Sequence, residues 1–130
     1  MTQIKLTIGD VVLHARLRAT PTARAIEAAL PFDSQAQLWG EEVYFHTPVT
    51  AALEADARAV VKAGELAFWV EGACIAIGFG PTPVSRGNEI RLAARTNIWA
   101  DTTDDVRALK TVNAGDRIIV ETLENSGEQK

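Results

Sequence analysis

Apolar and polar residues alternate from the start of the chain, and this pattern predicts a β-hairpin over residues 2–17. The pair Gly9-Asp10 supplies the turn between its two strands. The apolar positions are Ile4, Leu6 and Ile8 in the first strand and Val11, Leu13 and Ala15 in the second. A final strand is expected in "AGDRIIVETL" (residues 114–123), which begins with a turn and continues as an apolar run.

Two other segments carry apolar residues at helical spacing. In "TPTARAIEAAL" (residues 20–30), Thr20 is a natural N-cap, Pro21 suits the first helical position and Pro31 ends the helix. Its apolar stripe consists of Ala23, Ile26, Ala29 and Leu30. In "TTDDVRALKTV" (residues 102–112), Thr102 or Thr103 is expected to cap a second short helix, with two aspartates at its positive end.

The remaining apolar segments have strand-like patterns. The segment "SQAQLWGEEVYF" (residues 34–45) predicts a strand broken near Gly40, and "NEIRLAAR" (residues 88–95) alternates again. Residues 49–61 fit either two short strands or one or two helical turns, and we favour strands. The connections are too short for parallel crossovers, so two helices among about eight strands predict a mainly β domain, either a closed antiparallel barrel or a sandwich.

The stretch "GELAFWVEGACIAIGFGPTP" (residues 64–83) predicts a second hairpin. Glu71-Gly72 is taken as a two-residue loop in which Gly72 adopts a positive φ, and this places Trp69 opposite Cys74. One face is bulky and typical of an interior: Leu66, Phe68, Val70, Ile75, Ile77 and Phe79. The other face is small, and it consists of Ala67, Trp69, Cys74, Ala76 and Gly78.

The small face of this hairpin carries no charge, so we expect something to cover it. A helix is one candidate, because small residues let a helix approach closely. A ligand resting against Trp69 is another, and a second copy of the chain is a third, as a dimer contact. In the exit segment "GFGPTP", Gly78 and Gly80 allow close approach, while two prolines make the loop rigid.

Composition places the chain among ordinary soluble proteins. It has 130 residues, of which 47% are apolar and 23% charged, which fits one domain with one core. We expect residues 1–123 to form this domain and residues 124–130 to be a frayed polar tail. The single cysteine, Cys74, lies in an apolar run and is expected to be a buried small side chain rather than a reactive thiol.

Charge and hydropathy argue against two classes of partner. The net charge is −4, and the lysines and arginines are scattered, which argues against nucleic acid. No apolar run approaches the ~18 residues of a membrane span, and Met1 leads directly into a strand-like segment. We therefore expect a cytoplasmic protein that binds neither nucleic acid nor membrane.

Residue types that often carry chemistry occur here without the spacing that chemistry needs. The "GFGPTP" segment lacks the GK[ST] ending of a phosphate loop. His46 is interpreted as a loop histidine near the solvated carboxylates of Glu41 and Glu42, because no metal-ligand spacing accompanies it. Ser34 and Ser85 lack a G-x-S-x-G setting. We expect no metal and no other cofactor.

The order of several segments resembles that of a known family. The segments "LP", "WGEEVYF", "GELAFW" and "FGPTP" look like those of the cyclophilin-like family of small, mostly uncharacterised bacterial and archaeal proteins, and the resemblance runs from Ile4 to Leu123. It implies a closed eight-stranded antiparallel β-barrel capped by two short helices. It also implies an outer groove like that of true cyclophilins, where an arginine donates to the twisting X-Pro amide.

The segment in which the resemblance places that arginine, residues 34–45, contains none. Gln35 and Gln37 offer only uncharged donors there, and Arg91 is the best substitute from elsewhere in the chain. We therefore predict a binding module for a peptide segment or a small apolar ligand. A prolyl isomerase is the alternative, and an unidentified hydrolytic or metabolic enzyme is a more distant one.

The predicted groove combines aromatic residues from two strand regions. Its lining is expected to be Gln37, Trp39, Tyr44, Phe45, Trp69 and Phe79, and one edge is formed by Gly80, Pro81, Thr82 and Pro83. An arginine directed at the region between Trp39 and Trp69 would favour an isomerase. A groove lined only by neutral residues would favour binding.

Overall fold

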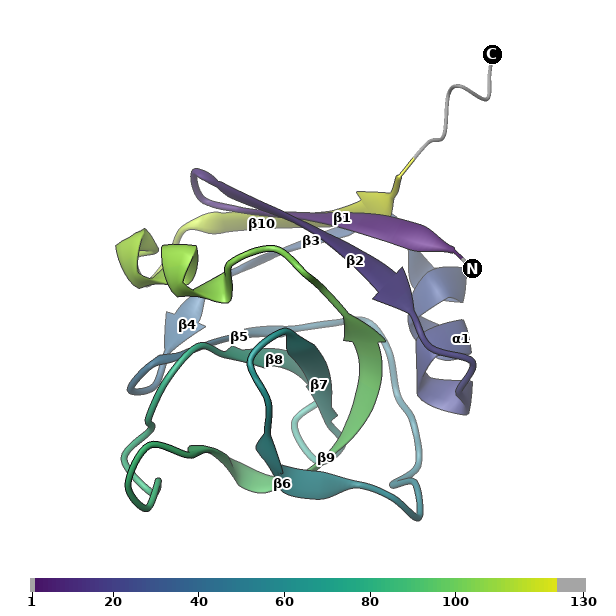
Figure 1. Cartoon of the computed structure of the whole chain (residues 1–130). Helices are drawn as coiled ribbons and strands as arrows, with labels where there is room; N and C mark the ends of the chain where they lie inside the picture. Colours follow the sequence, from purple (N-terminus) through teal and green to yellow (C-terminus); the bar gives the residue numbers. More distant parts are fainter. Residues whose placement is uncertain (1, 124–130) are drawn as a thin grey trace.

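One antiparallel sheet forms most of the structure, a computed structural model that describes residues 2–123 (Figure 1). Its strands are β1 (Gln3–Ile8), β2 (Val11–Leu17), β3 (Phe32–Gln35), β4 (Gln37–Leu38), β5 (Glu42–His46), β6 (Arg58–Val61), β7 (Glu65–Trp69), β8 (Cys74–Gly78), β9 (Ile90–Asp101) and β10 (Arg117–Thr122). The order is β3-β10-β1-β2-β9-β7-β8-β5-β4, and β6 pairs with β9 outside this path.

The two ends of this sheet meet at a single residue, Ala36. The Ala36 amide donates to the carbonyl of Asp116 at 2.8 Å, and the amide of Gly115 donates to the carbonyl of Ala36 at 2.8 Å. One residue later the chain pairs with β5 through Gln37 and Tyr44. The segment from β3 to β4 therefore joins both ends of the sheet into a nearly closed barrel. The predicted mainly β barrel is confirmed, with nine strands on the path where about eight were expected.

Alternating residues fill the barrel as the sequence pattern indicates. The opening hairpin has the predicted register around Gly9-Asp10, with Ile8 opposite Val11. Its inward residues Ile4 and Leu6 are fully buried. The largest fully buried side chains are those of Trp99, Phe45 and Phe68.

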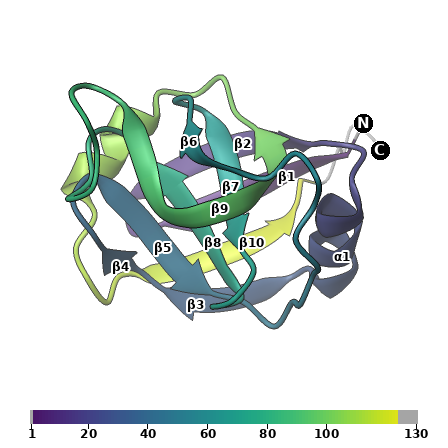
Figure 2. The same cartoon turned by 90° about the horizontal axis from the view of Figure 1, so that it is seen from below.

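Two short helices lie on opposite sides of the barrel (Figures 1 and 2). Helix α1 (Pro21–Ala29) begins as predicted, because the Thr20 hydroxyl accepts from the Ala23 amide. The second is a 3₁₀ helix, η1 (Val106–Thr111), and its cap is Asp105 instead of Thr102 or Thr103. The Thr102 hydroxyl donates to the carbonyl of His14 at 2.7 Å, so it is committed to β2. Within the described part of the chain, neither helix is long and apolar enough to cross a membrane.

Residues 49–61 form one strand, β6, where two were predicted. The segment before β6 is irregular, and the side chain of Asn97, which is fully buried, holds its backbone. The Asn97 amide donates to the carbonyl of Ala52 at 2.9 Å and accepts from the amide of Glu54 at 2.8 Å. One buried side chain thus replaces the hydrogen bonds that a strand ladder would have made.

The hairpin of β7 and β8 has the predicted register, with Trp69 opposite Cys74 and Ala67 opposite Ala76. Its bulky face lies in the main core, which confirms that assignment. The loop conformation differs from the expectation, because the positive φ of 53° belongs to Ala73 and not to Gly72. A turn closed by the Ala73 amide and the carbonyl of Val70 at 3.3 Å places the unusual conformation one residue later.

Candidate functional site

The small outer face of the β7–β8 hairpin is covered by strands, not by the helix that we considered first. The C-terminal half of β9 pairs with β7, whereas its N-terminal half leaves β7, pairs with β6 and curves across the sheet (Figure 2). A second apolar cluster lies between these layers. It consists of Val61, Ala67, Ala76, Leu92 and Ile98.

Beside this cluster the covering is incomplete and leaves a cavity of about 300 Å³. The cavity lies on the outer face of β5, β7 and β8, under the N-terminal half of β9. Its lining consists of Trp39, Glu42, Tyr44, Trp69, Cys74, Ala76, Leu92, Ala93, Ala94 and Thr96. Most of these side chains are apolar or aromatic, which is typical of a small-molecule site.

Three of the six residues predicted to line a groove meet in this cavity, namely Trp39, Tyr44 and Trp69. The other three lie elsewhere. Strand alternation turns Phe45 into the barrel, where it is fully buried, because Tyr44 faces outward. Phe79 packs against the same interior core, and Gln37 is exposed on β4 away from the cavity lining.

The "GFGPTP" loop, predicted as an edge of the groove, supports the cavity without lining it. The amide of Glu41 donates to the carbonyl of Pro81 at 3.0 Å, which ties this loop to the turn between β4 and β5. Thr82 is buried, and its hydroxyl donates to the carbonyl of Arg91 on β9. Close approach at both glycines is confirmed, since a Cβ would meet Ile90 at Gly78 and Glu41 at Gly80. Pro83 packs against Gly40.

Among the described residues, Glu42 is the one acidic side chain on the cavity lining, and its expected place in solvent is wrong. Its relative exposure is only 6%, and its Oε1 is buried with no hydrogen-bond partner among the described residues. This burial raises the pKa of Glu42 from 4.5 to about 7. Glu42 therefore changes its charge near neutral pH inside an apolar site.

The position of Glu42 in the cavity could be predicted from the sequence only with knowledge of a long-range strand register. Glu42 and Tyr44 alternate onto the outer face of β5, and β5 pairs with β8 so that Glu42 lies opposite Gly78. This register adds Glu42 to the uncharged small face of the hairpin. The pairing of β5 with β8 spans some thirty residues, and local periodicity does not specify it.

Cys74 is buried as predicted and forms no disulfide, and it also lines the cavity. Burial raises the pKa of its thiol, and the charge of Glu42 raises it further. The thiol is therefore poorly suited to nucleophilic chemistry. In the described part of the chain, no three His, Cys, Asp or Glu side chains come together as a metal site would require.

Arg91, the candidate catalytic arginine, does not reach the cavity lining. Its Nε donates to Oε2 of Glu89 at 2.6 Å, and its Nη2 lies 3.3 Å from Oε1 of the same carboxylate. The cavity lining contains no arginine among the residues that the structure describes. The arginine facing Trp39 and Trp69 that would favour an isomerase is thus not found among the described residues of this site.

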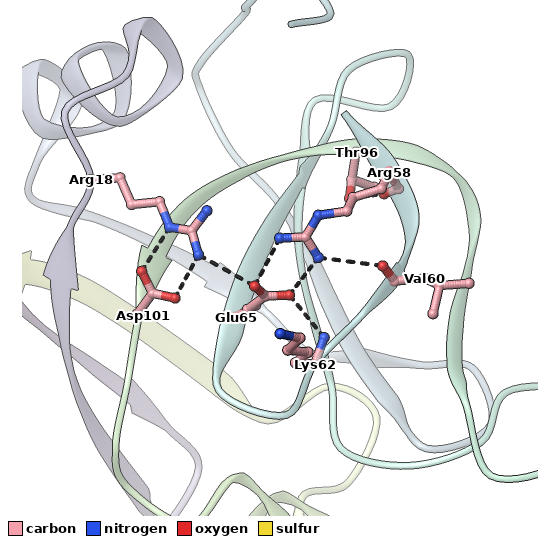
Figure 3. Close-up of polar contacts among 7 residues, drawn as sticks. All are labelled: Arg18, Arg58, Val60, Lys62, Glu65, Thr96 and Asp101. Carbon is pink, nitrogen blue, oxygen red and sulfur yellow. Dashed lines mark hydrogen bonds and ion pairs between the residues drawn. The ribbon is translucent and has the colours of Figure 1, made fainter. Parts of the chain in front are cut away.

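A second polar cluster surrounds Glu65, whose carboxylate is paired with arginines of the protein (Figure 3). Glu65 is 8% exposed and receives both guanidinium nitrogens of Arg58, at 2.7 and 2.8 Å, together with the Lys62 amide at 2.8 Å. Arg18 links Glu65, at 3.3 Å, to Asp101, at 2.7 and 2.8 Å. Hydrogen bonding from Arg58 lowers the pKa of Glu65 to about 2. This cluster fastens β6, β7 and β9 to the end of β2, and both oxygens of Glu65 already accept hydrogen bonds from the protein.

Comparison with known proteins agrees with the barrel fold. The profile of the Cyclophilin-like family matches residues 2–121, and the chain belongs to this family. The solution structure of the hypothetical protein AF2241 from Archaeoglobus fulgidus is similar, with a TM-score of 0.79 and 32% identity over 94% of this chain and 95% of that one.

McbB, whose structure was solved in complex with tryptophan, matches with a TM-score of 0.63 and 14% identity. The match covers 92% of this chain and 44% of McbB, so it shows a shared fold only. No curated protein matches the chain.

Proposed function

We propose that the protein is a binding module that takes a small ligand with a flat apolar group in the cavity between β9 and the outer face of β5, β7 and β8. The observation that carries this proposal is the meeting of Trp39, Tyr44 and Trp69 around about 300 Å³ of space. That volume lies at the lower end of the range for ligand pockets and suits one ring system better than an extended peptide.

The way in which Trp69 is held supports a site that is formed before the ligand arrives. A Cβ on Gly72 would overlap the six-membered ring of Trp69, so the indole packs directly on the loop backbone. A preformed aromatic wall lowers the entropy cost of binding. McbB shares only the fold with this chain, so the ligand class is argued from the cavity itself and not from the tryptophan bound to McbB.

A prolyl isomerase gains no specific support from the site. Catalysis of X-Pro rotation relies on a donor to the amide nitrogen, and Arg91 is held by Glu89 away from the cavity lining. The charged group that does line the cavity is an acid, Glu42.

An NMR titration tests the proposal with 2-phenylethanol, a neutral flat probe. The chain has three tryptophans, so three indole N–H signals report on it. We expect the signals of Trp39 and Trp69 to shift, whereas that of Trp99, which is fully buried and donates to the carbonyl of Ala67 at 3.1 Å, should shift much less. Absence of shifts at both cavity indoles would overturn the proposal.

Two further measurements distinguish other occupants. Faster cis–trans exchange of an X-Pro peptide on addition of the protein, lost in Trp39→Ala, would favour the isomerase instead. Broadening of the Trp39 and Trp69 signals that grows with protein concentration, without any probe, would indicate that a second copy of the chain fills the cavity.

A further inference from the structure

The cavity lining contains one polar group, the Glu42 carboxylate, with an oxygen that receives no hydrogen bond from the described residues. Buried carboxylate oxygens in folded proteins nearly always have a hydrogen-bond donor, yet Glu42 Oε1 has none among the described residues. The lining residues that β9 contributes, Leu92, Ala93, Ala94 and Thr96, are uncharged. None of the described residues donates a hydrogen bond to Glu42 Oε1, so the carboxylate is free to accept from a ligand.

The aromatic part of the lining indicates the sign of the charge that the site would accept. Faces of Trp and Tyr rings attract cations, most strongly where water is excluded. Trp39, Tyr44 and Trp69 surround the same cavity as the acidic Glu42, and no lysine or arginine lines it among the described residues. A carboxylate and three aromatic rings together favour an organic cation over an anion.

We propose that the ligand is a protonated amine attached to a flat apolar group, with its ammonium donating to the Glu42 carboxylate and its apolar part lying against Trp39 and Trp69. This inference rests on the proposed function, since it names the ligand class of the same cavity. The amine supplies the missing donor, and the aromatic lining accommodates both the ring and the charge.

Binding of such a cation depends on the ionised form of Glu42, and this gives the proposal a pH signature. Ionisation near pH 7 predicts an affinity for the amine about tenfold higher at pH 8 than at pH 6. The other titratable side chains on the lining are Tyr44 and Cys74, and the thiol of Cys74 is kept protonated by burial and by the charge of Glu42. A neutral probe of the same shape should show no such increase.

Three probes that share a phenyl ring separate charge from shape: 2-phenylethylamine, 2-phenylethanol and 3-phenylpropionate. In the NMR titration at pH 8 we expect the amine to bind at least about tenfold more tightly than the alcohol, consistent with one charge-assisted hydrogen bond, and the carboxylate to bind most weakly. In Glu42→Gln the preference for the amine over the alcohol should disappear. The matched control is Glu41→Gln, because Glu41 is exposed and does not line the cavity, and there the preference should persist.

The outcomes separate this inference from the function on which it rests. Equal affinities for amine and alcohol, or a preference that survives Glu42→Gln, would overturn the cationic ligand while leaving the cavity as a binding site. An affinity of the wild type for the amine that does not rise from pH 6 to pH 8 would overturn it without any variant. Failure of all three probes to shift the signals of Trp39 and Trp69 would overturn both proposals.

Discussion

Glu42 combines an ionisable group with surroundings that oppose its charge. Strand alternation directs it outward from β5, but the N-terminal half of β9 and the Trp39 segment cover that outer face. The folded chain holds the proton on Glu42 up to about pH 7, whereas the unfolded chain releases it near pH 4.5. The native state thus binds more protons than the unfolded state between these values, and the free energy of unfolding falls as the pH rises through this window.

Glu42→Gln removes this pH dependence, because its amide does not ionise. Relative to the wild type, the free energy of unfolding of the variant should grow by about 3 kcal/mol from pH 4.5 to pH 8, following the difference between the two pKa values. Urea unfolding at both pH values measures it, with the exposed Glu41→Gln as control. Parallel stability curves for Glu42→Gln and the wild type would show that Glu42 ionises as freely in the folded chain as in the unfolded one.

Gly72 has a steric role that differs from the turn role predicted for it. The sequence suggested a positive φ, but the residue with positive φ is Ala73, and the constraint at Gly72 is the ring of Trp69 resting on its backbone. Gly72→Ala should push the indole away from the loop and weaken binding of 2-phenylethylamine several-fold, at a cost in stability of about 1–3 kcal/mol. Glu71→Ala, at an exposed position in the same loop, is the control. Unchanged affinity in Gly72→Ala would show that Trp69 does not need this support.

Several elements were specified by local sequence alone. The register of both hairpins and the Thr20 cap of α1 follow from alternation, turn residues and capping chemistry within a few residues. The C-terminal half of β9 was missed, since it contains the polar Asn97 at a fully buried position and shows no alternation. Asn97 is buried because it holds the irregular segment around Ala52 and Glu54, a contact between positions more than forty residues apart.

The residues of the candidate site likewise fall into those that local sequence predicts and those that depend on distant contacts. Its aromatic residues Trp39, Tyr44 and Trp69 could be chosen from the sequence, because outward aromatics beside small residues suggest a wall. Phe45 was misassigned because the sequence does not show which residues of β5 face the barrel interior. Glu42 was missed because the pairing between β5 and β8 was not predicted. Strand phase and distant pairing are set by the closed barrel as a whole, so no local pattern reports them.

Glu65 joins three strands to the end of β2 through paired charges. Its contribution to stability depends on pH in the opposite direction to that of Glu42. Its pKa of about 2 means that stability from its pairing with Arg58 is fully present above pH 4.5 and is lost as the pH falls towards 2. Glu65→Gln should therefore lower the free energy of unfolding by about 3 kcal/mol at pH 7 and by much less near pH 2.

Urea unfolding of Glu65→Gln at both pH values tests this, and Asp105→Asn provides a matched contrast. Asp105 pairs with Arg107 at 3.1 Å, but their side chains are 63% and 77% exposed, so solvent screens the pair and breaking it should cost far less stability than breaking the Glu65 cluster. If the two variants lost similar stability, burial would not be what distinguishes the Glu65 cluster.

Fewer residues are paired on one side of Ala36 than on the other, because β3 pairs with β10 at four positions and β4 with β5 at two. Towards β10, the Ala36 backbone makes two hydrogen bonds of 2.8 Å. Towards β5, the connection is the two-residue strand β4, in which Gln37 and Leu38 are both exposed. Trp39 follows directly and lines the cavity. The residues that close the barrel, Ala36 and β4, are therefore adjacent in the chain to Trp39, which lines the proposed ligand site.

This arrangement predicts that the barrel opens first at β4 and that the opening exposes the cavity. In native-state hydrogen exchange, the amide of Trp39, which donates to the carbonyl of Glu42 at 3.0 Å, should exchange through an opening at least about 2 kcal/mol easier than that of the central amides of β1. Adding 2-phenylethylamine at about ten times its dissociation constant should slow hydrogen exchange of the Trp39 amide roughly tenfold, because the ligand must leave before β4 separates from β5. The amide of Gly9, in the turn between β1 and β2, should keep its rate. Exchange of Trp39 at the rate of the β1 amides would mean that β4 opens only when the whole barrel unfolds, and that ligands enter by another route.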